Sequence, residues 1–151
     1  MSLHERRALV TGASGALGAA IARRLARDGG HVVAHANGRI DAARAVAARI
    51  AAAGGSAEAV AFDVTDADAA RAACERLLAA GPIQIVVNNA GVHDDAVFPG
   101  MRAEQWHRVI DVSLHGFFNV TQPLVLPMVR TRWGGSSTSR RWPRSPATAA
   151  R

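Results

Sequence analysis

A glycine-rich turn close to the start of the chain is the first pattern whose residue types could do chemistry. Residues 11–18 read TGASGALG and follow a short apolar run at residues 8–10. Apolar residues then recur at helical spacing at Leu17, Ile21 and Leu25, so the pattern predicts a strand that turns through glycines into a helix. Glycines let a backbone approach a phosphate closely, and the first turn of a helix offers free N–H groups and a positive dipole end. The sequence therefore predicts a cradle for a dinucleotide cofactor.

Strands and helices alternate along the residues that must position this turn. Apolar runs predict strands at residues 7–11, 31–36, 57–62 and 83–87, and helical spacing predicts helices at residues 16–28, 41–53 and 66–80. A longer helix is expected after a loop at residues 91–102, and Pro123 and Pro127 should kink or end it. We therefore expect an α/β fold, a Rossmann-type doubly wound parallel sheet with helices on both faces, truncated after the fourth strand and the helix that follows it.

Composition limits the class of protein further. The chain of 151 residues is long enough for one domain with a core, and 49% of its residues are hydrophobic. No apolar run is long enough for a membrane span, and the polar start lacks the apolar core of a secretory signal. The single cysteine, Cys74, excludes an internal disulfide and is expected to be a small packed residue. A cytoplasmic location without a membrane partner is therefore expected.

The net charge of +6 comes mostly from the last residues of the chain. All 18 basic residues are arginines, and four of them lie within residues 134–151, a stretch without acids. This stretch is rich in Ser, Arg, Pro and Ala without a period, which predicts a basic, disordered tail after an incomplete domain at residues 1–133. Because the rest of the chain is near neutral, we expect no nucleic-acid partner.

Beyond the turn, the chain resembles the classical short-chain dehydrogenases/reductases. Four blocks match the family in the same order: the turn at 11–18, Asp63-Val64 after the third strand, NNAG at 88–91, and the stretch from Trp106 to Phe117. The resemblance covers residues 7 to about 133. Within the family, it is nearest to the 3-oxoacyl-(acyl-carrier-protein) reductases.

The resemblance implies a cofactor-binding role for each matched residue. The pyrophosphate turn would be formed by Gly12, Ala13, Ser14, Gly15 and Gly18, the adenine would contact Asp63 and Val64, and the ribose and nicotinamide would lie beside Asn89, Ala90 and Gly91. Asn88 is expected to pin adjacent strands instead. The chain departs from the family pattern at two positions. Ala16 replaces the middle glycine of the turn, and Ser113 replaces a helix asparagine that supports the proton relay.

The end of the second strand selects between NAD and NADP in folds of this kind. An acidic residue there binds the ribose 2′-hydroxyl of NAD. This chain has Ala36, Asn37, Gly38 and Arg39 at that place and no acid. Arg39 could pair with a 2′-phosphate, which favours NADP over NAD. The alternative is that Arg39 is a solvated loop arginine.

Two other groups of reactive side chains have a structural explanation. His31 and His35 share one face of a strand, but no third ligand follows at metal spacing. Satisfied or exposed histidines are therefore expected, and no metal site. His93, Asp94 and Asp95 follow NNAG directly, where we expect a solvated loop rim rather than an acid–base pair.

The side chains that would do the family's chemistry are absent. That chemistry needs a tyrosine as proton donor, a lysine that lowers the tyrosine pKa and a serine that positions the carbonyl. The chain contains no tyrosine and no lysine. No catalytic residue is therefore assigned, and this chain is expected to be inactive alone.

A shift of reading frame accounts for the tail. Family members continue after residue 134 with a strand similar to Ile-Val-Asn-Ile-Ser-Ser-Val-Ala, and codons for residues 135–143, read from the third base of the Gly135 codon, can encode it. We hypothesise a single-base deletion near codons 134–135 that removed the native fifth strand and left the fourth as an exposed edge. The alternative is a genuine basic tail. The coding DNA distinguishes the two, because a one-base correction must restore the strand and a Tyr-x-x-x-Lys downstream.

The resemblance implies an oxidoreductase of fatty-acid synthesis that moves hydride from NADPH to a carbonyl. The substrate would be a 3-oxoacyl or similar compound, either a small molecule or one carried on acyl-carrier protein, and the enzyme would be a homo-oligomer. Two alternatives from other classes stay open. One is a non-enzymatic dinucleotide-binding module, and the other is a nucleic-acid binder that acts through the arginine tail.

Overall fold

The sheet that the alternating pattern predicts is present and has five parallel strands. The computed structural model describes residues 3–138. The strands are β1 (Arg7–Val10), β2 (His31–Ala36), β3 (Ser56–Ala61), β4 (Ile85–Asn88) and β5 (Gly135–Thr138). Their order across the sheet is β3-β2-β1-β4-β5, and every neighbouring pair is parallel. The carboxyl ends of all strands therefore meet at one edge, where the glycine turn also lies.

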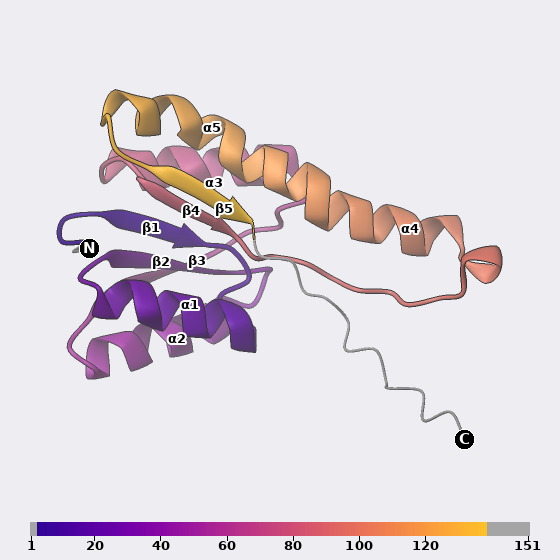
Figure 1. The fold of residues 1–151 in the computed structure, drawn as a ribbon, viewed down its shortest axis with the longest axis horizontal. Coiled ribbons are helices and arrows are strands. Elements are labelled where there is room, and N and C mark those ends of the chain that lie inside the picture. The colour runs from indigo at the N-terminus through magenta and orange to yellow at the C-terminus, as the bar shows by residue number, and fades with distance from the viewer. Residues whose placement is uncertain (1–2, 139–151) are drawn as a thin grey trace, which may run out of the picture.

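Helices cover both faces of this sheet, as the doubly wound prediction requires (Figure 1). The helices on one face are α1 (Ala16–Arg27) and α2 (Ile40–Ala52), and those on the other are α3 (Ala67–Ala79) and α5 (Gly116–Arg130). Each pair of helices covers one apolar core of the sheet. Val10, Val32 and Val87 face α1 and α2, and Leu9, Val33 and Val86 face α3 and α5. Strands buried on both faces account for the nearly continuous apolar runs of the sequence.

The apolar residues at helical spacing on α1 are not equally buried. Leu17 is 46% exposed, whereas Ile21 and Leu25 are half-buried and pack against the core. The buried residues of this helix are small: Gly18, Ala19, Ala22 and Ala26. A helix that starts within a tight turn lies close to the sheet, and small side chains permit that approach.

The long helix after the loop is continuous through both of its prolines. After a short 3-10 turn η1 (Phe98–Gly100), α4 (Ala103–Ile110) passes through a π-helical segment η2 (Asp111–His115) into α5. Pro123 and Pro127 both lie inside α5, so neither ends the helix, and the kink stays a prediction. Side chains of α5 that pack on α3 hold the helix in place on either side of the prolines: Val120, Leu124 and Met128.

The prediction of a sheet truncated after four strands, with a tail from residue 134, also needs correction. β5 pairs with β4 in register, with Val86 opposite Ser136, so β4 is not an edge. All four β5 residues are exposed. A parallel edge offers backbone hydrogen bonds to any residue that carries an N–H group, so a polar segment can add a strand there without burying side chains. The tail prediction for residues 139–151 lies outside the described residues.

Cys74 is part of the core beneath α5, and we expect it to be unreactive in the folded chain. Its Sγ is buried 3.7 Å from the carbonyl of Val120, and burial raises the pKa of the thiol to about 11. The thiolate is the reactive form, so a thiol reagent at about pH 8 should not label the native chain and should label it fully in denaturant. Mass spectrometry of both samples checks this, and labelling of the native chain at the denatured rate would contradict the buried position.

Among the described residues, none of the helices has the length and apolar character that crossing a membrane requires.

Candidate dinucleotide-binding site

Thr11 directly follows β1 and joins the glycine turn to the segment that follows β4. Its hydroxyl donates to the carbonyl of Val87 at 3.3 Å and accepts the backbone N–H groups of Asn89 at 3.0 Å and Ala90 at 2.9 Å. The residue is 2% exposed. One buried hydroxyl therefore brings together two blocks that lie far apart in the sequence, the turn at 11–18 and NNAG at 88–91.

The side chain of Asn89 fixes the path of the turn itself. Its amide Nδ2 donates to the carbonyl of Thr11 at 3.0 Å and to the carbonyl of Gly12 at 3.1 Å. These two bonds point the carbonyls of the turn toward Asn89. The N–H groups of Gly12, Ala13 and Gly15 already donate to acceptors of the protein, so the N–H groups at the start of α1 remain for a ligand.

Two glycines of the turn leave no room for a side chain. Gly12 has φ +63°, and a Cβ there would lie 3.0 Å from Cα of Ala90. A Cβ on Gly18 would lie 2.4 Å from the carbonyl oxygen of Gly12 and 2.6 Å from Nδ2 of Asn89. Ala16, which departs from the family pattern, is exposed at the start of α1, so its methyl group leaves the turn open.

The start of α1 has the electrostatics of an anion site. Gly15 caps the helix without a side-chain hydrogen bond, and no acidic residue lies in the first turn. Ser14 and Gly15 are both exposed. Uncapped N–H groups and the positive dipole end therefore face open space at this point.

Sequence reasoning assigned no functional role to His35, which contacts the turn twice. The ring accepts the N–H of Gly12 at Nδ1 over 3.2 Å, and its Nε2 lies 2.8 Å from the carbonyl oxygen of Phe62. The backbone carbonyl of His35 also accepts the N–H of Ala13 at 2.8 Å. Burial lowers the pKa of this imidazole, against the weaker influences of the Phe62 bond and the charge of Asp63. The expectation of a satisfied histidine is confirmed, and its place directly before residues 36–39 was the available signal.

Asp63 and Val64 follow β3 at the same edge of the sheet. Oδ1 of Asp63 accepts the backbone N–H and the hydroxyl of Thr65, both at 2.8 Å, which closes a tight turn. Val64 is buried, and Nδ2 of Asn119 donates to its carbonyl at 3.0 Å. A Cβ on Gly116 would lie 2.8 Å from the Val64 side chain, so α5 also holds this segment close.

The residues after β2 are exposed beside the start of α2. Gly38 has φ +66°, and Arg39 caps α2 with no side-chain hydrogen bond to the helix. Asn37 and Arg39 are both exposed. Within residues 3–138, no carboxylate forms an ion pair with Arg39. Its guanidinium is therefore available to an anionic ligand.

Asn88 has the strand-pinning role that the sequence predicts. Its Nδ2 donates to the hydroxyl of Thr121 on α5 at 2.9 Å and to that of Ser136 on β5 at 3.3 Å. These contacts join β4 to α5 and to β5, so this side chain supports β4 rather than a ligand.

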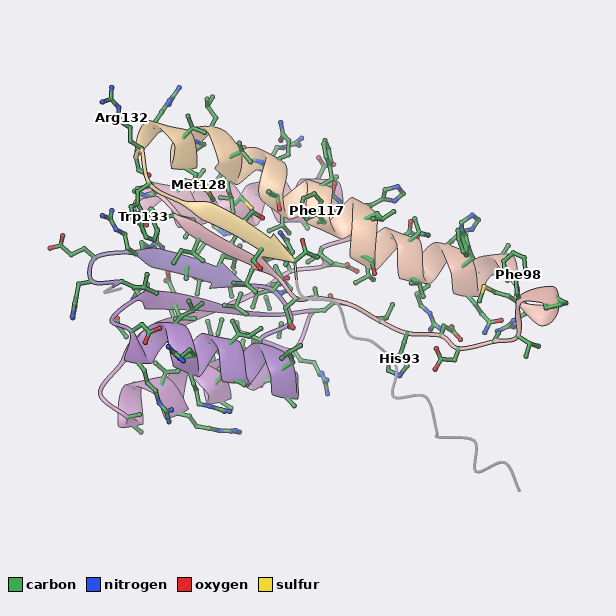
Figure 2. All side chains as sticks on the ribbon, in the orientation of Figure 1. His93, Phe98, Phe117, Met128, Arg132 and Trp133 are labelled. Carbon is green, nitrogen blue, oxygen red and sulfur yellow. The ribbon has the colours of Figure 1, made fainter. Side chains whose placement is uncertain are left out.

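The segment between β4 and α4 is held by side-chain contacts with α4. Asp94 accepts a hydrogen bond from Gln105 at 2.7 Å and pairs with Arg108, and its side chain is only 16% exposed. The prediction of a solvated rim was therefore wrong for Asp94, because α4 carries donors at the right spacing. Its neighbour His93 is exposed and is labelled on the same segment in Figure 2.

The position of the family's relay asparagine lies in the π-helical segment. Ser113 is exposed on η2. No side chain of the chain can supply the tyrosine or lysine of the relay, since neither residue type occurs. In the described part of the chain, no three potential metal ligands of the His, Cys, Asp and Glu types lie together.

The sheet, the glycine turn and the segment after β4 define a short-chain dehydrogenase, and the chain belongs to that family. The family model of the short chain dehydrogenases matches residues 6–136. Among curated relatives, the 3-oxoacyl-(acyl-carrier-protein) reductase FabG of Aggregatibacter actinomycetemcomitans is 41% identical over 84% of this chain and 53% of its own length. The acetoacetyl-CoA reductase of Paracoccus denitrificans is 39% identical over 84% of this chain and 51% of its own length.

Solved structures agree with this assignment. A 3-oxoacyl-(acyl-carrier-protein) reductase from Agrobacterium tumefaciens with NADP bound matches with a TM-score of 0.84 at 34% identity, over 91% of this chain and 53% of that one. A gluconate 5-dehydrogenase from Burkholderia cenocepacia in complex with NADP and tartrate has a TM-score of 0.85 at 33% identity, over 91% and 54%. The chain thus spans about half the length of the relatives it matches.

Proposed function

We propose that this chain forms the dinucleotide-binding part of an NADP-dependent short-chain reductase. The observation that carries the proposal is the turn from Gly12 to Gly18, where a Cβ added to either of these two glycines would crowd the backbone and the helix that follows has no side-chain cap. The residues present therefore fit a pyrophosphate, which would accept hydrogen bonds from the free N–H groups at the start of α1.

The other cofactor contacts would come from the same edge of the sheet. Ala13, Ser14 and Gly15 would complete the pyrophosphate turn, while Asp63 and Val64 would support the adenine. Asn89, Ala90 and Gly91 would lie along the ribose and the nicotinamide. The amide of Asn89 already holds the turn, so its contribution to the cofactor would be made through the backbone.

Arg39 supports NADP rather than NAD as the cofactor. Its exposed guanidinium and the neighbouring Asn37 lie after β2, where an acidic residue would select NAD. A guanidinium is suited to bind a phosphate because its N–H donors match the phosphate oxygens. The two structural relatives above contain NADP, which agrees with this assignment.

The bound NADPH would supply a hydride to a carbonyl carbon of the substrate. This chain would bind and orient the cofactor, and because it has no tyrosine or lysine to donate the proton, we expect no turnover from it alone. A 3-oxoacyl compound, small or carried on acyl-carrier protein, is the proposed substrate of the whole enzyme in the cytoplasm. The missing proton donor also keeps open a non-enzymatic dinucleotide-binding role.

Exposed apolar residues on the long helix support the proposal that the whole enzyme is a homo-oligomer. The chain exposes Leu114, Phe118, Leu126 and Val129 along η2 and α5. Figure 2 shows Phe117 on the same helix and Phe98 at its outer end, and Phe98 is 80% exposed. Apolar surface of this kind marks a protein contact in many proteins.

The cofactor proposal is tested by measuring NADPH and NADH binding to the chain and to the Arg39→Ala variant. Loss of the guanidinium should weaken NADPH binding about tenfold and leave NADH binding nearly unchanged, since only NADPH carries the 2′-phosphate. The fluorescence of the reduced cofactors reports both affinities. Addition of a 3-oxoacyl thioester should give no NADPH oxidation.

Arg49→Ala is the matched control, because Arg49 is also an exposed arginine of this region but lies in the last turn of α2. It should bind both cofactors as the unchanged chain does. An equal loss for NADPH and NADH in Arg39→Ala would remove the support for NADP. No binding of either cofactor to the unchanged chain would overturn the proposed function.

A further inference from the structure

We propose that His35 is a positioning residue of the dinucleotide turn. Its neutral ring fixes the turn, where the phosphates would bind, relative to the segment after β3, where the adenine would bind. The inference rests on the proposed function, because it assigns a role within the same site. The ring bridges the N–H of Gly12 in the turn and the carbonyl of Phe62, directly before Asp63.

The two hydrogen bonds permit only one protonation state of the ring. The N–H of Gly12 is a donor, so Nδ1 must present its lone pair over the 3.2 Å contact. Nε2 must then carry the hydrogen and donate to the carbonyl of Phe62 over 2.8 Å. A second proton would place an N–H on Nδ1 that faces the N–H of Gly12. Two donors would then oppose each other at the turn.

Burial also disfavours the protonated form of the ring. His35 is 1% exposed, and the Phe62 ring lies against it with centroids 4.3 Å apart. Water therefore cannot hydrate a protonated ring, and burial holds the pKa of the imidazole below its ordinary 6.5. The neutral form is the one that positions Gly12.

The charged groups around the ring do not offset this effect. The turn and β1 from Ala8 onward carry no ionisable side chain, and Glu58 of β3 pairs with Arg7 and His31 at the other end of the strands. Asp63 is the neighbour whose charge favours protonation, and that influence is the weakest of the three on the ring. Three carboxylates of α3 and η2 have partners of their own: Asp66 caps α3, Asp68 pairs with Arg71, and Asp111 pairs with His115.

Cofactor affinity should therefore fall as the ring takes up a proton. Above about pH 6.5 the ring is neutral in the folded chain, and binding should not depend on pH through this group. Below the lowered pKa of the folded state, the dissociation constant for NADPH should rise about tenfold for each unit of pH. A role confined to packing would give no such slope.

The test measures NADPH binding from about pH 8 to about pH 5 on the unchanged chain and on His35→Asn, at pH values where circular dichroism shows a folded chain. Asn keeps an acceptor for the N–H of Gly12, but it cannot take up a proton and is too short to reach Phe62. At high pH, the NADPH affinity of His35→Asn should be about fivefold lower than that of the unchanged chain, because one hydrogen bond is lost. The dependence of affinity on pH that comes from residue 35 should vanish. His31→Asn is the matched control on the same strand, and it should keep the pH slope of the unchanged chain.

A second measurement decides the inference without the cofactor. In the NMR spectrum of the unchanged chain, the amide of Gly12 should titrate with the same midpoint as the His35 ring, and in His35→Asn it should not titrate. The inference would be overturned if the Gly12 amide signal did not change while the ring titrates, or if NADPH affinity stayed constant across the titration of the ring. If NADPH does not bind at any pH, the proposed function fails, and the role of His35 is then tested by the titration of the Gly12 amide alone.

Discussion

Gly18→Ala is expected to destabilise the chain by about 3 kcal/mol and to abolish NADPH binding, although it adds a single methyl group. The new Cβ would lie 2.4 Å from the carbonyl of Gly12, 2.6 Å from Nδ2 of Asn89 and 2.8 Å from Cα of Ala13. Two of these three atoms are backbone, so no rotation of a side chain relieves the contact. The turn must open, and opening it breaks the bonds from Asn89 that fix the turn carbonyls.

Gly15→Ala is the matched control for this prediction. A Cβ there would lie 3.5 Å from the carbonyl of Gly12, an ordinary contact, and Gly15 has φ −79°, which alanine adopts without strain. Loss of glycine at a helix N-cap should cost about 1 kcal/mol or less. Urea unfolding of both variants gives the two free energies. Equal costs would show that the close approach at Gly18 does not constrain the turn.

The elements that position the site could be predicted from the sequence because apolar patterns report burial. The runs around Val32, Val33 and Val86 are buried on both faces of a parallel sheet, and such runs are hard to confuse with loops. Asn88 could also be assigned, since a polar residue at the end of a buried strand needs a partner. Thr121 and Ser136 supply that partner.

The parts that could not be predicted depend on tertiary contacts. The small buried face of α1 follows from how closely the helix approaches the sheet, which the positions of Leu17 and Ile21 do not report. The prolines of α5 are tolerated because packing on α3 outweighs the loss of helical hydrogen bonds. β5 forms through backbone pairing with β4, and its four exposed residues carry no apolar signal.

The role of His35 shows the same limit within the site. A histidine on a strand can be exposed, satisfied or a metal ligand, and the residue type alone does not separate these states. The separation comes from the turn, which offers a backbone N–H to Nδ1, and from Phe62, which offers a carbonyl to Nε2. These partners lie 23 and 27 residues away in the sequence, so only the folded chain brings them to the ring.

Thr11→Val should cost about 2 kcal/mol of stability and weaken NADPH binding, even though the two side chains have nearly the same shape. Valine fills the space of the threonine, which is 2% exposed, but it removes the acceptor for the N–H of Ala90. The N–H of Asn89 loses one of its two acceptors and keeps the carbonyl of Val87 at 3.0 Å. The main cost is therefore the unpaired N–H of Ala90, at the point where NNAG leaves β4.

Thr11→Ser separates the hydroxyl from the methyl group. Serine keeps the acceptor and loses one buried methyl, so it should cost about 1 kcal/mol and leave NADPH affinity within about twofold of the unchanged chain. Urea unfolding and cofactor fluorescence measure both variants under one set of conditions. If valine binds NADPH as well as serine does, then the hydroxyl of Thr11 stabilises the sheet without shaping the cofactor site, and the link between the turn and NNAG must be carried by Asn89 alone.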